Sequence, residues 1–239
     1  MTLILVGIAA FMSTLLGGWF ALRISDKLHL ILGFSAGAVI AVAFFDLLPE
    51  AIELAGKEHG VPAITSVAAL GFLLYMVLDR TVVLHTGGDE GLGHHRRRGR
   101  LGAGSLSIHS FLDGVAIGLA FQVSASVGII VAIAVLVHDF SDGINTVNLV
   151  IKNSGTSEEA FRWLLLDAAA PVAGLASTVF FVLPETDLGL ILALFCGFFL
   201  YIGASDLLPE SYHAHPKKLT TAMTILGAAL LYAAIRLME

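Results

Sequence analysis

The chain has 239 residues, of which 57% are hydrophobic and only 13% are charged, with a formal net charge of -6. Soluble domains carry about 25% charged residues, so this composition excludes an ordinary soluble protein. Apolar runs of about 20 residues, each long enough to cross a ~30 Å hydrocarbon core, recur along the chain. The alternating apolar and polar pattern of a membrane β-barrel is absent from the sequence. The composition therefore predicts an all-α polytopic membrane protein.

The apolar runs give eight predicted transmembrane helices, numbered here in chain order. Their ranges are 2–22, 30–54, 63–84, 103–123, 126–152, 157–182, 187–210 and 216–237. The first run has no positive segment before it, so we interpret it as a retained helix rather than a cleaved signal peptide. The whole chain, 1–239, is predicted to form a single transmembrane domain.

The 13 lysine and arginine residues are distributed unevenly over the predicted loops and helix ends. With the N-terminus outside, eleven fall on the cytoplasmic side, and only Lys57 and Arg236 fall on the other side. The eleven are Arg23, Lys27, Arg80, Arg96, Arg97, Arg98, Arg100, Lys152, Arg162, Lys217 and Lys218. Cytoplasmic loops carry an excess of such residues, so we expect both termini outside. The short loops favour a bacterial cytoplasmic (inner) membrane.

The only long predicted loop, 85–102, is cytoplasmic in this orientation and contains the stretch HTGGDEGLGHHRRRGR. Its glycines and charges predict a flexible segment. The loop carries His85, His94 and His95. It is either a basic linker that fixes the topology or a loop that collects metal ions in the cytosol.

An internal repeat is visible in DLLPEA at 46–51 and DLLPES at 206–211. The two copies fall in the second and seventh helices, which cross the membrane in opposite directions. This arrangement is typical of an inverted repeat, with helices one to three related to helices six to eight around a central pair. Pro49 and Pro209 each remove a backbone hydrogen bond, which either kinks the helix or frees a carbonyl to line a cavity.

A second motif, His-x-Phe-x-Asp-Gly, occurs once in each central helix, as HSFLDG at 109–114 and HDFSDG at 138–143. Its histidine and aspartate are four residues apart and therefore share one helix face. The polar residues on or beside these two faces are His109, Ser110, Asp113, His138, Asp139, Asp142 and Asn145.

The depth of these residues follows from folding the central pair about the polar turn centred on Ala125. In antiparallel helices, equal distances from the turn mean equal depth. His109 is then level with Asp142, and Asp113 is level with His138. The two levels are four residues apart, roughly 6 Å along the helix axis. We therefore predict a compact cluster of imidazole and carboxylate groups.

Four predicted buried acids lie in the apolar helices without a lysine or arginine at their depth, namely Asp113, Asp139, Asp142 and Asp167. Each aspartate at a helix centre costs roughly 2.5–3.5 kcal/mol to insert. Protons or a bound cation must compensate for this cost. Imidazole and carboxylate ligands suit divalent first-row metals, although a proton relay or hydrogen-bonded packing of helices is an alternative.

Further acidic residues lie toward both ends of the predicted helices. Asp46 and Glu50 lie in the outer half of the second helix, and Asp206 and Glu210 lie at the cytoplasmic end of the seventh, followed by His213. An acidic ladder of this kind is what a cation path through a membrane needs. The alternative for the outermost of these residues is that they are simply solvated at the helix ends and do not line a path.

The repeated Leu-Pro-Glu motif, the eight helices and above all HSFLDG and HDFSDG resemble the ZIP family of divalent metal transporters, in its prokaryotic form. The likeness extends over essentially the whole chain. It implies that one group of helices (first, fourth, fifth and sixth) moves against the others, often in a dimer. It also implies a transport site lined by His109, Ser110, Asp113, His138, Asp139 and Asp142.

The sequence departs from the usual family pattern at three places. The family's glutamates are aspartates here, at Asp113 and Asp142, so a site that bridges two metals would require closer helices. Ala170 stands where many prokaryotic members have a glutamate. The resemblance therefore assigns the metal-binding role of that glutamate to Asp167, one turn earlier. No methionine ligand is assigned in the second helix.

These observations predict a transporter that moves divalent transition-metal ions toward the cytoplasm by alternating access. Zinc is the leading substrate, and iron, manganese, cadmium and cobalt are the other candidates. The metal is substrate rather than cofactor, and the expected partners are the metal ions, the lipid bilayer and a second copy in a homodimer, without nucleic acid. The alternative is an intramembrane zinc-dependent hydrolase, which needs a water-activating zinc with an open position. The chain lacks His-Glu-x-x-His and has more carboxylates than such a site requires, so we expect no enzyme.

Overall fold

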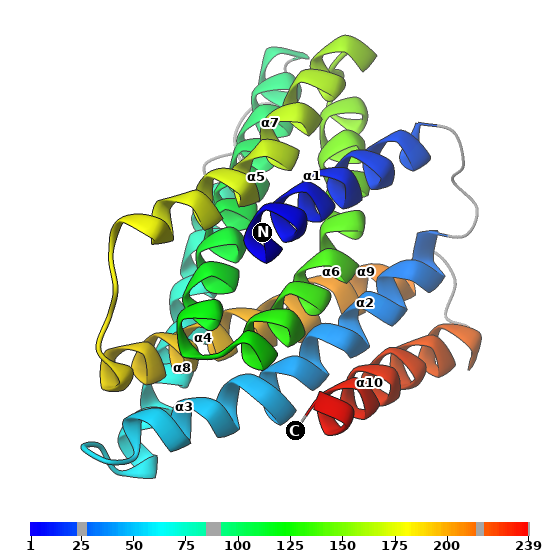
Figure 1. The fold of residues 1–239 in the computed structure, drawn as a ribbon. Coiled ribbons are helices and arrows are strands. Elements are labelled where there is room, and N and C mark those ends of the chain that lie inside the picture. Colours follow the sequence, from blue (N-terminus) through cyan, green and yellow to red (C-terminus); the bar gives the residue numbers. More distant parts are fainter. Residues whose placement is uncertain (23–27, 85–91, 214–217, 239) are drawn as a thin grey trace. The chain divides into compact units, whose positions relative to one another are not determined.

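The computed structural model of the chain describes residues 1–22, 28–84, 92–213 and 218–238. Every regular element in this part of the chain is helical (Figure 1). The elements are α1 (Thr2–Ala21), α2 (Leu28–Val42), the π-helical turn η1 (Ala43–Leu47), α3 (Leu48–Ala55), α4 (Val61–Leu84), α5 (Leu92–Val123), α6 (Ala125–Lys152), α7 (Ser157–Ser177), the 3-10 turn η2 (Thr178–Phe180), α8 (Glu185–Tyr201), the π-helical turn η3 (Ile202–Leu207), α9 (Leu208–His213) and α10 (Lys218–Met238).

Eight helical segments of the described chain are long and apolar enough to cross a membrane. They correspond one to one with the predicted spans, because α2–η1–α3 and α8–η3–α9 each form one continuous segment. The all-α class and the number of spans are therefore confirmed.

The largest difference in boundaries concerns α5, which begins at Leu92 rather than at 103. The segment between α4 and α5 is accordingly shorter than the predicted loop over 85–102. The stretch LGHHRRRGR has no apolar run, so hydrophobicity does not mark the start of the helix there. Arginine is a good helix former, and the helix extends beyond its apolar part. The side chains of His94 and His95 lie outside the described residues.

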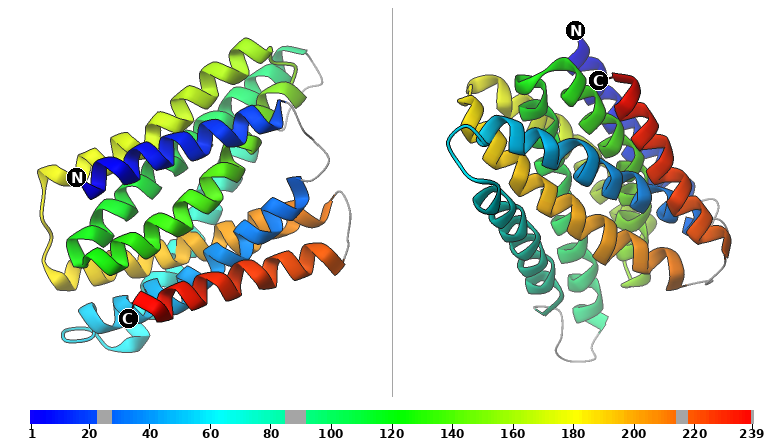
Figure 2. Two further views of the ribbon diagram at one scale, coloured as in Figure 1. Left: turned by 45° about the vertical axis from the view of Figure 1, so that its right-hand side comes forward. Right: turned by 90° about the horizontal axis from the view of Figure 1, so that it is seen from below.

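The chain forms two compact units. Unit 1 comprises Met1–Ser25, Val77–Val115 and Asp139–Ser177, and unit 2 comprises Asp26–Met76, Ala116–His138 and Thr178–Glu239. In unit 1, α1 packs against α7. In unit 2, α10 runs along α2, and α3 packs against α8 (Figures 1 and 2). Both units share the long helices α5 and α6, each of which changes unit part-way along its length.

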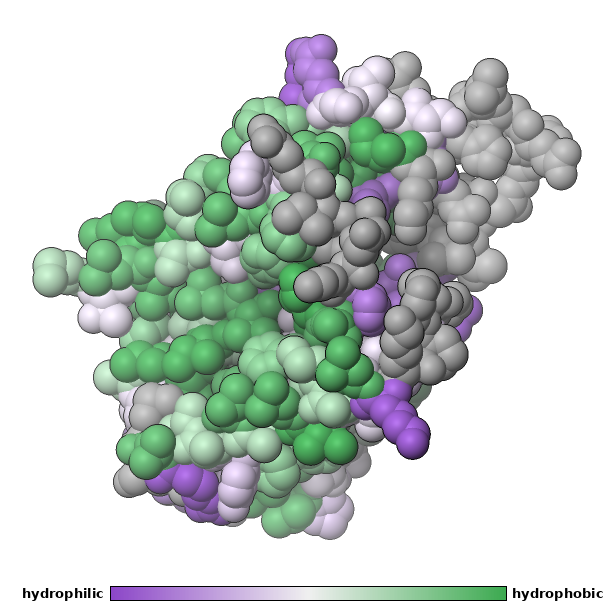
Figure 3. All heavy atoms as spheres, turned by 90° about the vertical axis from the view of Figure 1, so that its right-hand side faces the viewer, coloured by the Kyte–Doolittle hydropathy of each residue, from purple (hydrophilic) through white to green (hydrophobic). Residues whose placement is uncertain are grey.

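The side chains of α1 are distributed in the reverse of the pattern found in soluble proteins. Its buried face consists of small residues, namely Gly7, Ala10, Thr14, Gly17 and Gly18. Its exposed face carries large apolar residues at helical spacing, namely Leu5, Ile8, Met12, Leu16 and Trp19. Small residues at helix contacts, with large apolar residues outside, are typical of helices packed in a membrane. Figure 3 shows hydrophobic side chains over much of the face in view.

A π-helical turn precedes the proline in each copy of DLLPE. In η1 the N–H of Leu48 bonds the carbonyl of Ala43, and in η3 the N–H of Leu208 bonds the carbonyl of Gly203. Each bond spans five residues instead of four, so one extra residue is accommodated just before the proline. Such π-bulges are rare and concentrate at functional sites. The prolines thus belong to a repeated local change in the helix hydrogen-bond pattern.

Candidate metal site

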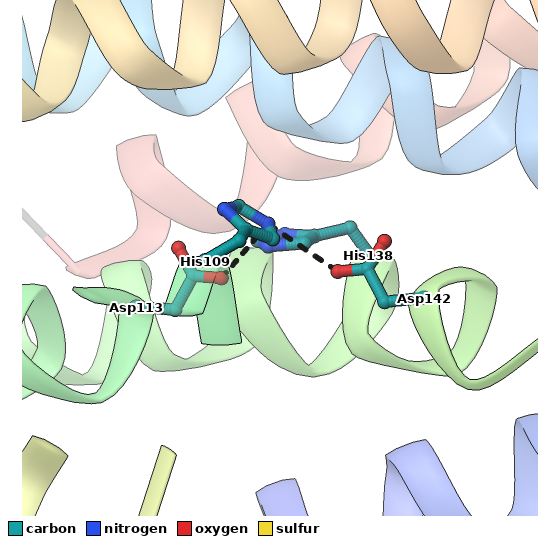
Figure 4. A group of neighbouring side chains, drawn as sticks. All are labelled: His109, Asp113, His138 and Asp142. Carbon is teal, nitrogen blue, oxygen red and sulfur yellow. Dashed lines mark ion pairs between the residues drawn. The ribbon is translucent and has the colours of Figure 1, made fainter. Parts of the chain in front are cut away.

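The fourth and fifth predicted spans, now α5 and α6, bring their two motif copies together. His109 Nε2 lies 3.0 Å from Asp113 Oδ2 on the same face of α5. The same nitrogen lies 3.4 Å from Asp142 Oδ2, on α6. Figure 4 marks both ion pairs with dashed lines. The imidazole of His109 therefore joins the carboxylates of the two helices.

His138 is the fourth member of the group. The boundary between the units falls directly after it, but α6 continues unbroken, so His138 is held one turn before Asp142. Its Nδ1 lies 2.9 Å from the carbonyl oxygen of Ala134. A carbonyl can only accept, so this contact requires a proton on Nδ1, and in a neutral imidazole the lone pair that a metal needs is then on Nε2.

His109, Asp113, His138 and Asp142 each offer one ligand atom, and these atoms all lie within 4.8 Å of one another (Figure 4). The sequence predicted a compact cluster of these imidazole and carboxylate groups. Ligand atoms about 2.0–2.1 Å from a tetrahedral zinc ion lie roughly 3.4 Å apart, so a small inward movement would complete such a site. Two imidazole nitrogens and two carboxylate oxygens form a donor set suited to divalent first-row metals.

All four side chains are buried. Their exposed fractions are 3% for His109, 2% for Asp113, 0% for His138 and 1% for Asp142. Carboxylates this far from water are costly unless an opposite charge lies beside them. A divalent cation among the four would neutralise both aspartates at once.

The glycine that ends each motif copy explains how neighbouring helices reach the site. A Cβ at Gly114 would overlap the carbonyl oxygen of Pro171 on α7, and one at Gly143 would overlap that of Thr14 on α1. Each motif aspartate is thus followed by a residue that allows direct contact between two helix backbones. Close helix contact through small residues is a common way to pack helices in membranes.

The contacts are reciprocal, because the motif phenylalanines meet glycines of the same two helices. A Cβ at Gly174 of α7 would overlap the carbonyl oxygen of Phe111, and one at Gly17 of α1 would overlap that of Phe140. The two copies of the motif therefore dock a neighbouring helix in the same way, α5 against α7 and α6 against α1. These contacts join α1 and α7 to the parts of α5 and α6 that belong to unit 1.

Ser110 and Asp167 form a second polar group with Thr146. The hydroxyl of Ser110 donates to Asp167 Oδ1 at 2.7 Å, and that of Thr146 donates to Oδ2 at 2.7 Å. All three residues are fully buried. Thr146 was missed in the sequence analysis, although it lies four residues after Asp142 and so shares its helix face.

Two further predicted site residues lie outside the group of four. Asp139 is fully buried on α6, and Asn145 is partly exposed on the same helix. Asp139 does not belong to the group of ligand atoms within 4.8 Å.

The predicted path residues are described only in part. Asp46 is buried in η1, Glu50 is half-buried in α3 and Glu210 is exposed in α9. The side chains of Asp206 and His213 lie outside the described residues.

The sequence profile of one protein family, described as "ZIP Zinc transporter", matches residues 89–234. The chain belongs to the ZIP family. The matched stretch includes both metal-site motifs and the second Leu-Pro-Glu motif. The resemblance inferred from HSFLDG and HDFSDG is therefore confirmed.

Individual relatives agree with this assignment. Zinc transporter ZupT from Corynebacterium efficiens is 28% identical over 224 residues, which cover 84% of both chains. Zinc transporter YKE4 from Saccharomyces cerevisiae is 25% identical over 174 residues, covering 64% of this chain and 49% of YKE4. Zinc transporter ZIP6 from Homo sapiens is 30% identical over 107 residues, covering 44% of this chain and 14% of ZIP6. The likeness thus extends over most of a bacterial relative but only part of the eukaryotic ones.

Membership of the ZIP family has direct consequences. ZIP proteins are integral membrane transporters of metal ions, not enzymes, so the intramembrane hydrolase is not favoured. In ZIP transporters zinc is a substrate, and no cofactor is needed. The nitrogen and oxygen donors of the cluster on α5 and α6 are of the types that suit such an ion.

Proposed function

We propose that this protein moves divalent transition-metal ions, zinc foremost, into the cytoplasm by alternating access, within a single transport domain spanning 1–239. The observation that carries the proposal is the group of four buried ligand atoms, two nitrogens and two oxygens, within 4.8 Å of one another. Iron, manganese, cadmium and cobalt share the same ligand preferences and are the other candidate substrates.

The proposed 3+2+3 inverted repeat is supported by helix contacts in unit 2. A Cβ at Gly37 would overlap the carbonyl oxygen of Thr224, and one at Gly197 would overlap that of Ala68. Gly37 and Gly197 lie 160 positions apart, which is also the spacing of the two DLLPE motifs. The second and seventh spans thus use corresponding glycines to contact the eighth and third spans.

Unit 1 supports the repeat in the same way. Gly17 of α1 and Gly174 of α7 lie 157 positions apart, and so do Thr14 and Pro171, whose carbonyls meet the motif glycines. The motif copies themselves are 29 positions apart. A contact pattern that recurs at constant spacing is expected if α1 and α7 are equivalent neighbours of two equivalent central helices.

The transport path follows from the same proposal. The metal would enter past Asp46 and Glu50, bind at the central cluster and leave past Asp206, Glu210 and His213. Acids on both sides of a buried cation site favour a path over a closed pocket. The distribution of basic residues supports termini on the outside of a bacterial cytoplasmic membrane, and a homodimer is the proposed assembly.

Uptake into proteoliposomes loaded with a metal-sensitive dye tests the proposal. Zinc, iron(II), manganese, cadmium and cobalt are offered in turn to the wild type and to His109→Ala/Asp142→Ala. A matched control, His59→Ala/Asp187→Ala, removes the same residue types outside the cluster. We expect uptake by the wild type and the control but not by the site variant. Metal binding without flux of any ion would contradict transport.

A further inference from the structure

The hydrogen bonds of Asp167 connect three helices of unit 1. Asp167 is on α7, whereas its two donors are on the ligand-bearing helices, Ser110 on α5 and Thr146 on α6. Ser110 directly follows the ligand His109, and Thr146 comes one turn after the ligand Asp142. Each carboxylate oxygen accepts one hydroxyl at 2.7 Å. Hydrogen bonds to an ionised carboxylate are roughly twice as strong as those between neutral groups.

Helix packing alone does not require this carboxylate. By the spacing of the proposed repeat, the counterpart of Asp167 in α1 is Ala10, and the counterpart of Thr146 in α5 is Ile117. Ala10 and Ile117 are both buried. Since α1 docks on α6 through the same reciprocal glycine contacts with an alanine at this position, those contacts do not depend on a carboxylate such as Asp167.

We infer that Asp167 is a positioning residue which, through Ser110 and Thr146, sets the separation of α5 and α6 at the level of the metal. Asp167 then acts from outside the ligand shell, because each of its oxygens is directed at a hydroxyl. His109, Asp113, His138 and Asp142 already supply the four donor atoms that a tetrahedral site needs. Residues that orient metal ligands typically change metal affinity by about 10- to 100-fold when they are altered. The inference rests on the proposed metal site.

Two substitutions at Asp167 distinguish positioning from ligation. Asparagine can accept one hydroxyl hydrogen bond through its oxygen and donate to the other hydroxyl through its NH₂ group, so Asp167→Asn keeps the bridge. Asp167→Leu removes both bonds and replaces the carboxylate with a somewhat larger apolar side chain. We expect the zinc dissociation constant of Asp167→Asn to stay close to the wild-type value and that of Asp167→Leu to rise about 10- to 100-fold.

Thr146 provides the matched pair of variants. Thr146→Val keeps the shape and removes the hydroxyl, whereas Thr146→Ser keeps the hydroxyl. We expect Thr146→Val to raise the zinc dissociation constant about tenfold and Thr146→Ser to restore it. Affinity is measured on full-length protein in detergent by competition with a fluorescent zinc chelator. The melting temperature of the metal-free protein is measured in parallel.

Three results would overturn the inference. If Asp167→Asn loses as much affinity as Asp142→Ala, then Asp167 is a ligand. If Thr146→Val lowers the melting temperature but leaves the zinc affinity unchanged, the group serves stability alone. If Asp142→Ala itself binds zinc like the wild type, the proposed metal site is wrong, whatever the variants of Thr146 show.

Discussion

His109 and Asp142 are 33 positions apart in the sequence, yet Nε2 of the first lies 3.4 Å from Oδ2 of the second. The pair joins α5 to α6 and places one histidine and one aspartate of different motif copies in the same group. With Asp113 and His138, it provides four ligand atoms that face one another in a buried space. The following predictions depend on this arrangement.

Substitution of a ligand aspartate should weaken zinc binding more than substitution of its buried neighbour on the same helix. Asp142→Asn replaces a carboxylate of the group of four, so we expect the dissociation constant to rise by more than the roughly 10- to 100-fold typical of outer residues. Asp139→Asn should have a smaller effect, because Asp139 lies outside that group. Equal effects in a chelator competition assay would favour the ligand set implied by the family resemblance instead.

The protein should hold one zinc ion per chain at the central cluster. Four ligand atoms complete one tetrahedral site, and aspartate side chains are one methylene shorter than the glutamates usual in the family. Metal content is measured by elemental analysis after removal of free zinc, in a His94→Ala/His95→Ala background that removes two of the loop histidines. Two zinc ions per chain, both lost in His109→Ala, would contradict a site for a single metal.

The glycine contacts around the site predict the stability of two alanine variants. A Cβ at Gly143 would overlap the carbonyl oxygen of Thr14, so α6 and α1 must separate in Gly143→Ala. Overpacking of this kind costs about 1–3 kcal/mol. Gly104, also in a membrane-spanning helix, is the control, since the nearest atom to its Cβ would be 3.6 Å away, on Trp163.

The two alanine variants are compared by unfolding in increasing concentrations of SDS. Gly143→Ala should unfold earlier than the wild type, and Gly104→Ala should unfold at the same point or later, because alanine favours helix. Combining Gly143→Ala with Gly17→Ala should cost less than the sum of the two, since both substitutions separate the same helices. Unchanged stability of Gly143→Ala would mean that α1 and α6 do not meet at this glycine.

The parts of this fold that were predictable from sequence are those that produce a periodic signal. Eight long apolar runs determine eight spans, and a fixed rise per residue determines which residues are level across the turn at Ala125. This is why His109 and Asp142 could be paired without a structure. The recurrence of the motif in two helices strengthened an otherwise weak pattern.

Other features leave no such signal. A threonine within an apolar helix commonly bonds the carbonyl four residues earlier, so nothing in the sequence marks Thr146 as a partner of Asp167. The π-helical turns before Pro49 and Pro209 depend on a shift of one residue in the backbone hydrogen bonds, which many side chains tolerate. The start of α5 at Leu92 lies in a charged stretch where hydrophobic periodicity is uninformative.

The proposed orientation can be tested by labelling single introduced cysteines, because the native cysteine should not react with the label. Cys196 is the only cysteine of the sequence, it is buried, and its thiol donates to the carbonyl of Ala43 at 3.3 Å. A thiol enclosed in this way is inert, so a membrane-impermeant maleimide should not label the native protein in intact cells.

New cysteines at two exposed positions then report the two sides of the membrane. Glu58→Cys lies between α3 and α4, on the predicted outer side, and should react in intact cells. Ser157→Cys lies at the start of α7, on the predicted inner side, and should react only after the cells are permeabilised. The reverse pattern would invert the topology and place the acidic pair Asp46 and Glu50 at the cytoplasmic end. Since the proposed entry of metal begins at that pair, the same result would also reverse the proposed direction of the transport path.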